Sequence, residues 1–170
     1  FLLPSCQQDA LSVPGLVFSS RTTFSRSLSS LISGSVGIFV SSLGAIKTKI
    51  RRPEKLLTES LTVRVGDKIS QSIIIEKLAL WGYEPSDPCL SPKTFAKRGG
   101  ILDLFTEFSG HPLRLEFLGD TISSIRLFSP DTQLSEGLRT RCVLFPPVFS
   151  SARSENSLGD ILESICPVVL

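Results

Sequence analysis

Alternation of apolar and polar positions predicts a small antiparallel sheet in the middle of this chain. Residues 112–118 read PLRLEFL and place every second, apolar side chain on one face. Gly119 and Asp120 suit a tight turn, after which residues 121–128 form the next predicted strand. Because so short a connection joins the two strands, they must pair antiparallel. Residues 95–105 supply a first strand before this pair, which predicts a three-stranded meander.

A sheet with one apolar face is not stable alone, and the chain offers a helix to cover it. Ile74, Leu78 and Trp81 recur at helical spacing within residues 70–83, and Gly82 suits the C-terminal end of that helix. The pattern therefore predicts an α+β fold, a β-meander covered by a helix.

Patterns typical of an α/β domain flank this region. Residues 19–34 have helical spacing, residues 36–40 form a short apolar run typical of a buried parallel strand, and residues 41–50 predict a second short helix. Pro53 is expected to stop that helix. Strand and helix in this order indicate part of a βαβ fold.

The predicted domain organisation has three parts. Residues 1–57 are a partial α/β domain, residues 58–135 the α+β unit, and residues 136–170 a segment that returns to the α/β domain. Within this last part, residues 142–147 predict a strand and residues 157–165 a helix.

Composition narrows the classes of function. Hydrophobic residues make up 41% of the 170, enough for a core, while a net charge of +2 argues against a protein that mainly coats nucleic acid. Four cysteines without a close pair, and the one histidine, His111, argue against a metal site. No apolar run reaches the length of a membrane span. The chain starts at Phe1 and has no Met, so we expect a piece of a longer cytoplasmic protein.

Catalytic motifs are sparse. The phosphate-binding pattern G-x-x-x-x-G-K-[ST] is absent, so we expect this piece to bind no ATP itself and hold no cofactor. Asp103 and Glu116 could form an acid–base pair, but Arg98, Arg114 and Arg126 lie nearby in the predicted sheet. A cross-strand charge ladder explains these residues more simply than a hydrolase, and we expect no catalytic residue.

Two basic segments have alternative interpretations. Lys47, Lys49, Arg51 and Arg52 form either a solvated helix end or a nucleic-acid patch, although no aromatic residue interleaves them for stacking.

Lys97 and Arg98 precede Gly99 and Gly100 inside the first predicted strand of the sheet. They are either a solvated strand end or cations held out for an acidic partner that approaches the glycine backbone. Residue chemistry alone leaves both interpretations open.

A family resemblance bears on this choice. The segments GYEPSDPCLSPKTFAKRGGILDLF and LRLEFLGDTISSIRLFSPDTQLS resemble the second domain of bacterial transcription-repair coupling factors (Mfd), whose pattern includes E-F-x-x-R-G-G-I-L-D-[IL]-F-P. The excision-repair protein UvrB has a related domain. The match covers about residues 58–135. It departs from the family or from UvrB at Pro85, Ala96 and Thr106, where those proteins have arginine, arginine and proline.

The resemblance implies a docking module for UvrA, the damage-recognition protein of nucleotide excision repair. The family's docking arginine before the R-G pair corresponds to Arg98, and we expect Lys97, Gly99 and Gly100 around it, with Tyr83 and Phe95 as apolar anchors.

The resemblance also implies a longer parent protein. That parent is expected to be an ATP-dependent DNA translocase whose motor uses ATP and magnesium and which binds RNA polymerase and double-stranded DNA elsewhere. The alternative is a nucleic-acid-binding fragment of a UvrB-type helicase, using Lys47, Lys49, Arg51 and Arg52.

Overall fold

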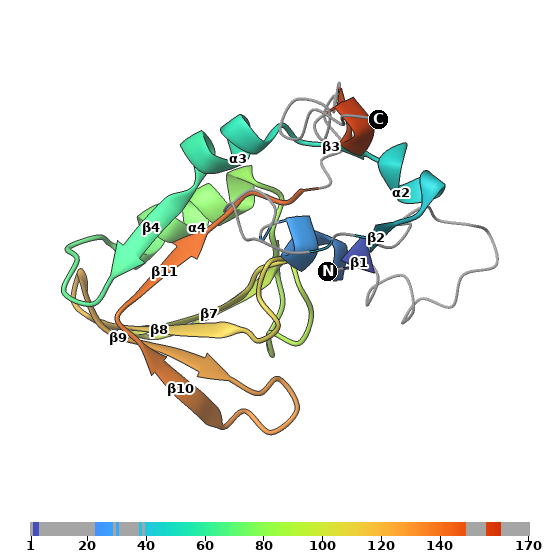
Figure 1. Cartoon of the computed structure of the whole chain (residues 1–170). Coiled ribbons are helices and arrows are strands. Elements are labelled where there is room, and N and C mark those ends of the chain that lie inside the picture. Colours follow the sequence, from blue (N-terminus) through green and yellow to red (C-terminus); the bar gives the residue numbers. More distant parts are fainter. Residues whose placement is uncertain are drawn as a thin grey trace. The chain divides into compact units, whose positions relative to one another are not determined.

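The chain forms two compact units in a computed structural model (Figure 1). The structure describes residues 2–3, 23–28, 30, 38, 40–148 and 156–160. The first unit combines Phe1–Thr58 with Val148–Leu170, and the second unit is Glu59–Pro147. Among the described residues, no helix is both long and apolar enough to cross a membrane.

A six-stranded sheet forms the centre of the second unit. Its order is β10-β9-β8-β7-β6-β5, and all neighbours pair antiparallel except the short β5, which is parallel to β6. The strands are β5 (Glu84–Pro85), β6 (Thr94–Arg98), β7 (Ile101–Phe105), β8 (Leu113–Leu118), β9 (Thr121–Phe128) and β10 (Ser135–Arg139). The predicted α+β class and the antiparallel meander are confirmed, within a larger sheet than expected.

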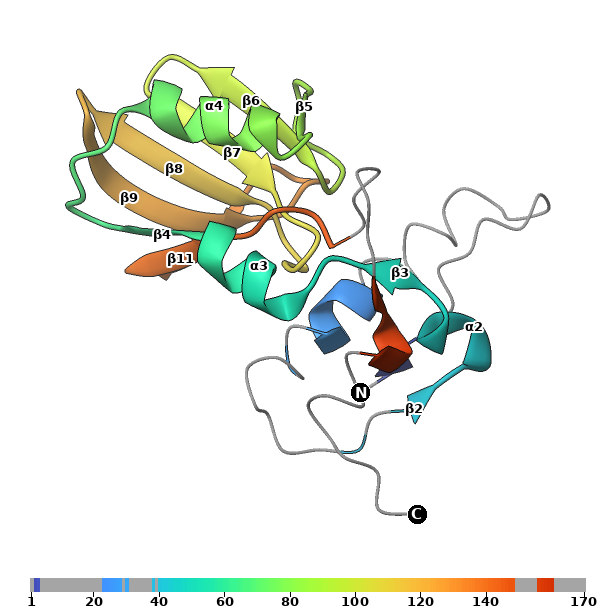
Figure 2. The same cartoon turned by 90° about the horizontal axis from the view of Figure 1, so that it is seen from above.

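Helix α4 (Gln71–Leu80) covers one face of this sheet, as Figure 2 shows. The helix residues Ile74 and Leu78 are fully buried between the helix and the sheet, and Trp81 packs against the same core. Gly82 follows the C-cap residue Trp81, and its φ of +81° is a left-handed conformation that glycine adopts without strain. The buried core comprises Val63, Ile74, Leu78, Tyr83, Phe95, Leu102, Leu104, Leu113, Leu115, Ile122, Ile125 and Leu144.

A separate two-stranded ribbon closes the second unit. Strand β4 (Leu61–Arg64) pairs antiparallel with β11 (Arg141–Leu144), so residues about eighty positions apart lie side by side. This pairing places Val63 and Leu144 in the core. The unit consequently extends to Pro147, beyond residue 135 where the sequence placed its end, because β10 and β11 complete its sheets.

The glycine pair lies between two strands and not within one. We predicted a single strand over residues 95–105, but β6 ends at Arg98 and β7 begins at Ile101. Arg98 and Ile101 are partners in the antiparallel register, so Gly99 and Gly100 form a two-residue hairpin turn. Gly99 has a φ of +54°, which explains its residue type.

The first unit confirms its predicted elements only in part, since the helix predicted over residues 41–50 is observed at Leu43–Ile46 and Lys49–Ile50 form a strand instead. Residues 23–28 are helical and bury Phe24 and Leu28 completely. Strand β1 (Leu2–Leu3) pairs parallel with β2 (Val40–Ser41). The expected burial of residues 36–40 is wrong for the two of them that the structure describes, since Ile38 is 82% exposed and Val40 is 57% exposed.

Short elements complete the described part of the first unit. Helix α2 (Leu43–Ile46) is capped by Ser42, whose hydroxyl accepts a hydrogen bond from the Ala45 amide at 3.2 Å. Pro53 begins α3 (Pro53–Glu59) instead of merely stopping a helix, because proline fits the first helical position, which needs no amide donor.

Strand β3 (Lys49–Ile50) pairs with β12 (Asn156–Ser157). The predicted helix over residues 157–165 is present at residues 158–160, whereas Ser157 belongs to β12 and residues 161–165 lie outside the described residues.

Candidate functional site

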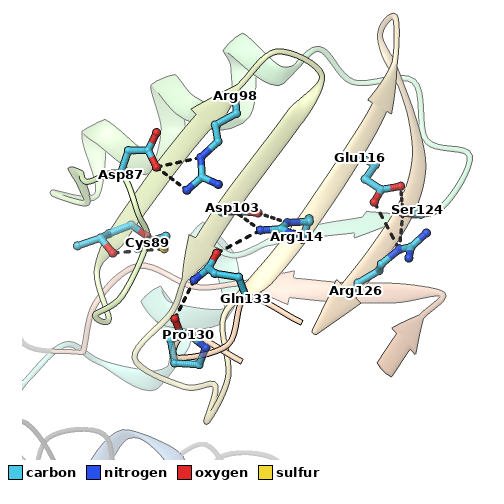
Figure 3. Close-up of polar contacts among 11 residues, drawn as sticks. Asp87, Cys89, Arg98, Asp103, Arg114, Glu116, Ser124, Arg126, Pro130 and Gln133 are labelled. Atoms are coloured by element: carbon cyan, nitrogen blue, oxygen red, sulfur yellow. Dashed lines mark hydrogen bonds and ion pairs between the residues drawn. The ribbon is translucent and has the colours of Figure 1, made fainter. Parts of the chain in front are cut away.

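The sheet face opposite α4 carries arginines that are each paired with a carboxylate (Figure 3). These residues lie on this face because side chains alternate along a strand, and their neighbours Leu102, Leu115 and Ile125 point into the core beneath α4. The pairs are Arg98–Asp87, Arg114–Asp103 and Arg126–Glu116. The Arg114 side chain is 21% exposed, whereas those of Arg98 and Arg126 are 41% and 40% exposed, so burial separates the central pair from the other two.

The central pair is buried and rigid. Arg114 donates from Nε to Asp103 Oδ1 at 2.7 Å and from Nη2 to Oδ2 at 2.8 Å, a bidentate bond between residues directly opposite in the register of β7 and β8. The Asp103 side chain is 1% exposed and that of Arg114 21%. The guanidinium also lies 4.5 Å from the Phe128 ring centroid. Hydrogen bonding to Asp103 raises the pKa of Arg114. This pair stabilises the sheet and is poorly accessible to a partner.

A second pair lies towards β9. Arg126 Nε approaches Glu116 Oε1 at 3.4 Å, and the Ser124 hydroxyl donates to Glu116 Oε2 at 2.7 Å. Each carboxylate on this face thus bonds a cation from a neighbouring strand. The cross-strand ladder predicted from the sequence is confirmed, and it occupies both carboxylates that had been considered as an acid–base pair.

Arg98 lies at the end of β6, and of the two accessible arginines it has the more exposed carboxylate partner. Its Nε donates to Asp87 Oδ1 at 2.9 Å, and its Nη2 donates to the same oxygen. The Arg98 side chain is 41% exposed and that of Asp87 59% exposed, so the pair stands in solvent. The hydrogen bond to Asp87 raises the pKa of Arg98. A surface pair of this kind contributes at most about 1 kcal/mol to stability, which leaves the guanidinium free to engage a partner.

The chain's own backbone occupies the space beside Gly100. The Phe117 amide donates to the Gly100 carbonyl at 2.7 Å, and a Cβ added at Gly100 would lie 2.9 Å from the Phe117 carbonyl oxygen. The hypothesis that Gly100 leaves room for a partner's backbone is therefore wrong on that side. A Cβ added at Gly99 would meet nothing within 4 Å, so the positive φ alone explains why this residue is glycine.

Tyr83 and Phe95 are core residues and not exposed anchors, which corrects the sequence hypothesis. Tyr83 is 4% exposed and Phe95 is 7% exposed, and both pack beneath α4. The Tyr83 hydroxyl donates to the Phe145 carbonyl at 3.1 Å. Burial raises the pKa of Tyr83, because the phenolate would lack water around it.

Lys97 is exposed beside Arg98, but strand alternation directs it to the opposite face of β6. The structure therefore brings Arg98 together with Gly99 and Gly100 at one hairpin, and it separates Lys97 from the face that carries the ion pairs.

The basic segment of the first unit is a distinct surface. Lys47, Lys49 and Arg52 are exposed, and Arg51 is half-buried. The Arg52 guanidinium donates to Asn156 Oδ1 at 3.2 and 3.3 Å, which links the segment before α3 to β12. Part of this charge thus supports the fold of the first unit.

Sequence reasoning missed Asp87, because no local spacing relates it to Arg98. The two residues meet because the loop after β5 folds back over β6, where Cys89 is 1% exposed. Its thiol lies 3.3 Å from the Thr94 hydroxyl, and burial raises the pKa of Cys89 to about 11, as expected for a packed and unreactive thiol.

The described residues contain no group of three or more His, Cys, Asp or Glu side chains that could hold a metal ion.

Comparison with known proteins gives a consistent match for the second unit. The family model described as UvrB interaction domain matches residues 61–148. A transcription-repair-coupling factor of Staphylococcus aureus (strain bovine RF122 / ET3-1) is 33% identical over 111 residues, which cover 65% of this chain and 9% of that relative. The corresponding protein of Mycobacterium bovis is 36% identical over 99 residues, covering 55% of this chain and 8% of the relative. The chain therefore spans less than a tenth of the length of these relatives.

Proposed function

Because this chain belongs to the UvrB interaction domain family, we propose that its second unit is a protein-docking module of a transcription-coupled repair factor. Its partner is UvrA, and its role is to recruit UvrA to lesions where RNA polymerase has stalled. The unit performs no chemistry itself. Docking takes place on the sheet face opposite α4, at the hairpin between β6 and β7.

The exposed Arg98 is the single observation that carries this proposal. The guanidinium stands at the end of β6, and its only hydrogen-bond partner among the described residues is Asp87, which is itself exposed. A planar guanidinium with free donors suits bidentate recognition of a carboxylate, whereas the buried Arg114 has its donors already engaged. The acidic group that binds is therefore expected to approach Arg98.

The remaining functions belong to the parent protein. We propose that it is a cytoplasmic ATP-dependent DNA translocase, on the ground that the relatives of which this chain covers 8–9% are transcription-repair-coupling factors. Its motor would use ATP and magnesium, and its contacts with RNA polymerase and double-stranded DNA would lie outside this chain.

Charge reversal at Arg98 tests the docking proposal. We expect Arg98→Glu to weaken UvrA binding more than about tenfold, because it sets two like charges against each other. Thermal stability should barely change, since the Asp87 pair is exposed. The matched control is Arg64→Glu, which makes the same charge change at an exposed residue of β4, outside the six-stranded sheet. Equal UvrA affinity of Arg98→Glu and wild type, measured by biolayer interferometry, would refute the proposal.

Salt dependence distinguishes this function from nucleic-acid binding by Lys47, Lys49, Arg51 and Arg52. A complex held by phosphate contacts loses affinity with a log–log slope of about −0.9 per contact. Tight DNA binding by this chain with such a slope, abolished by reversing these four charges, would favour a nucleic-acid-binding fragment instead.

A further inference from the structure

Asp87 contacts one particular edge of Arg98. A guanidinium has two edges that can bind a carboxylate: a side edge formed by Nε and Nη2, and an end edge formed by Nη1 and Nη2. Asp87 Oδ1 accepts from both donors of the side edge, with Nε at 2.9 Å. Nη1 makes no hydrogen bond to any of the described residues. The end edge of a side chain that is 41% exposed therefore remains available.

We propose that Asp87 is the positioning residue of this docking site. It holds the side edge of Arg98, so that the end edge faces outwards and accepts a carboxylate of the partner bidentately. The two carboxylates then flank one guanidinium, and docking requires no rupture of the Asp87–Arg98 pair. This inference rests on the proposed docking function and adds the orientation in which the arginine is recognised.

The loop that carries Asp87 is anchored on both sides, which is a requirement for a positioning role. The Ser86 amide donates to the Phe95 carbonyl at 2.8 Å just before Asp87. Just after it, the buried Cys89 thiol lies 3.4 Å from the Thr94 carbonyl. Both contacts attach the loop to β6, the strand that also carries Arg98. The carboxylate is thus held in a constant place relative to the guanidinium that it orients.

Positioning favours binding through entropy. A free arginine on a surface samples many rotamers, and a partner that binds it must immobilise it at a cost in affinity. Asp87 immobilises the side chain before the partner arrives, so the complex loses less entropy on forming.

The charge of Asp87 has the opposite effect. A carboxylate beside the site repels an acidic partner, so its removal would tighten binding if Asp87 acted through charge alone. The sign of the change in affinity therefore distinguishes orientation from electrostatics. Glu116 offers a matched control on the same sheet face, since it also pairs with an arginine, Arg126, at 3.4 Å and is itself 32% exposed.

The test is the affinity of the complete 170-residue chain for UvrA, measured by biolayer interferometry at constant salt. We expect Asp87→Ala, which removes the Oδ1 acceptor together with the charge, to weaken binding by about three- to tenfold, the loss due to a side chain that must be ordered on binding. Glu116→Ala, which removes a carboxylate that does not contact Arg98, should leave the affinity unchanged or slightly higher. In an Arg98→Lys background, Asp87→Ala should cause no further loss, because an ammonium group has no edges to orient.

The outcomes separate this inference from the function on which it rests. If Arg98→Glu weakens binding while Asp87→Ala leaves it unchanged or tighter, the positioning role is overturned and docking stands. If Arg98→Glu has no effect, the docking proposal itself fails. Should Asp87→Ala lower the unfolding temperature, Asp87→Glu decides: it preserves charge but displaces the oxygen, so a loss of affinity supports positioning and full affinity overturns it.

Discussion

The buried Asp103–Arg114 pair allows a quantitative test of how this sheet is stabilised. The two partners are unequally buried, because the Asp103 side chain is 1% exposed and that of Arg114 is 21% exposed. Arg114→Met removes both donors while retaining most of the side-chain stem, and it leaves a carboxylate that water cannot reach. Leaving a buried charge without its partner lowers the free energy of unfolding by about 3 kcal/mol. This value is at the low end of the range for broken buried ion pairs, because Arg114 is partly exposed to solvent.

Asp103→Asn should cost less. The amide is nearly isosteric and keeps one acceptor for Arg114, which also lies over Phe128 and donates to Gln133 at 3.5 Å. We expect a loss of about 1 kcal/mol, the value of one weakened hydrogen bond. The double variant should be destabilised by less than the sum of the two, because without Arg114 the neutral amide is easier to bury than the carboxylate.

Urea denaturation followed by the fluorescence of Trp81 measures these differences. Trp81 is the sole tryptophan of the chain and packs against the core of the second unit, so its signal reports the unfolding of that unit. A cost for Asp103→Asn that equals or exceeds the cost for Arg114→Met would refute the reasoning. So would additive effects in the double variant, since they would show that the two side chains are not coupled.

Two further predictions concern residues that the structure reassigns. Gly100→Ala should lower the unfolding free energy by about 1–3 kcal/mol, since its Cβ would lie 2.9 Å from the Phe117 carbonyl oxygen. Gly99→Asn, which tolerates a positive φ, is the control, and a Gly100→Ala variant as stable as this control in urea would contradict the assigned contact. The raised pKa of Tyr83 predicts stability that is fully present below the ordinary phenol pKa of 10.0 and is lost as pH rises above it. Tyr83→Phe should cost about 1 kcal/mol at neutral pH and reduce the alkaline loss, and urea midpoints between about pH 8 and 11 that fall in parallel for both proteins would refute this.

Local pattern was sufficient for the regular elements of the second unit. The alternation in residues 112–128 predicted β8, β9 and their antiparallel pairing, and the helical spacing predicted α4 with its end at Gly82. These features depend on neighbours within a few positions, where the period of the side chains decides which face is buried. The opposite charges of Asp103 and Arg114 in adjacent strands were likewise enough to predict a ladder.

The candidate site was only half predictable. Sequence context left Arg98 either a solvated strand end or a docking residue, and the docking role was implied by the family resemblance. The structure leaves its side chain 41% exposed at the sheet face. Tyr83 and Phe95 were misassigned, because an aromatic residue beside a charged motif has the same local pattern whether it lines an interface or a core. Only the packing of α4 against the sheet shows that both are buried.

Residue order alone determined the amphipathic strands, the covering helix and the turn at Gly119, because each of these follows from the preferences of a short segment. The tertiary structure alone decided which distant segments meet. It placed Asp87 on the side edge of Arg98, the backbone of Phe117 against Gly100, and β11 beside β4. Such contacts join residues that neither the helical nor the strand periodicity of the sequence relates to each other. They form only when sheet register and core packing bring separate parts of the chain together.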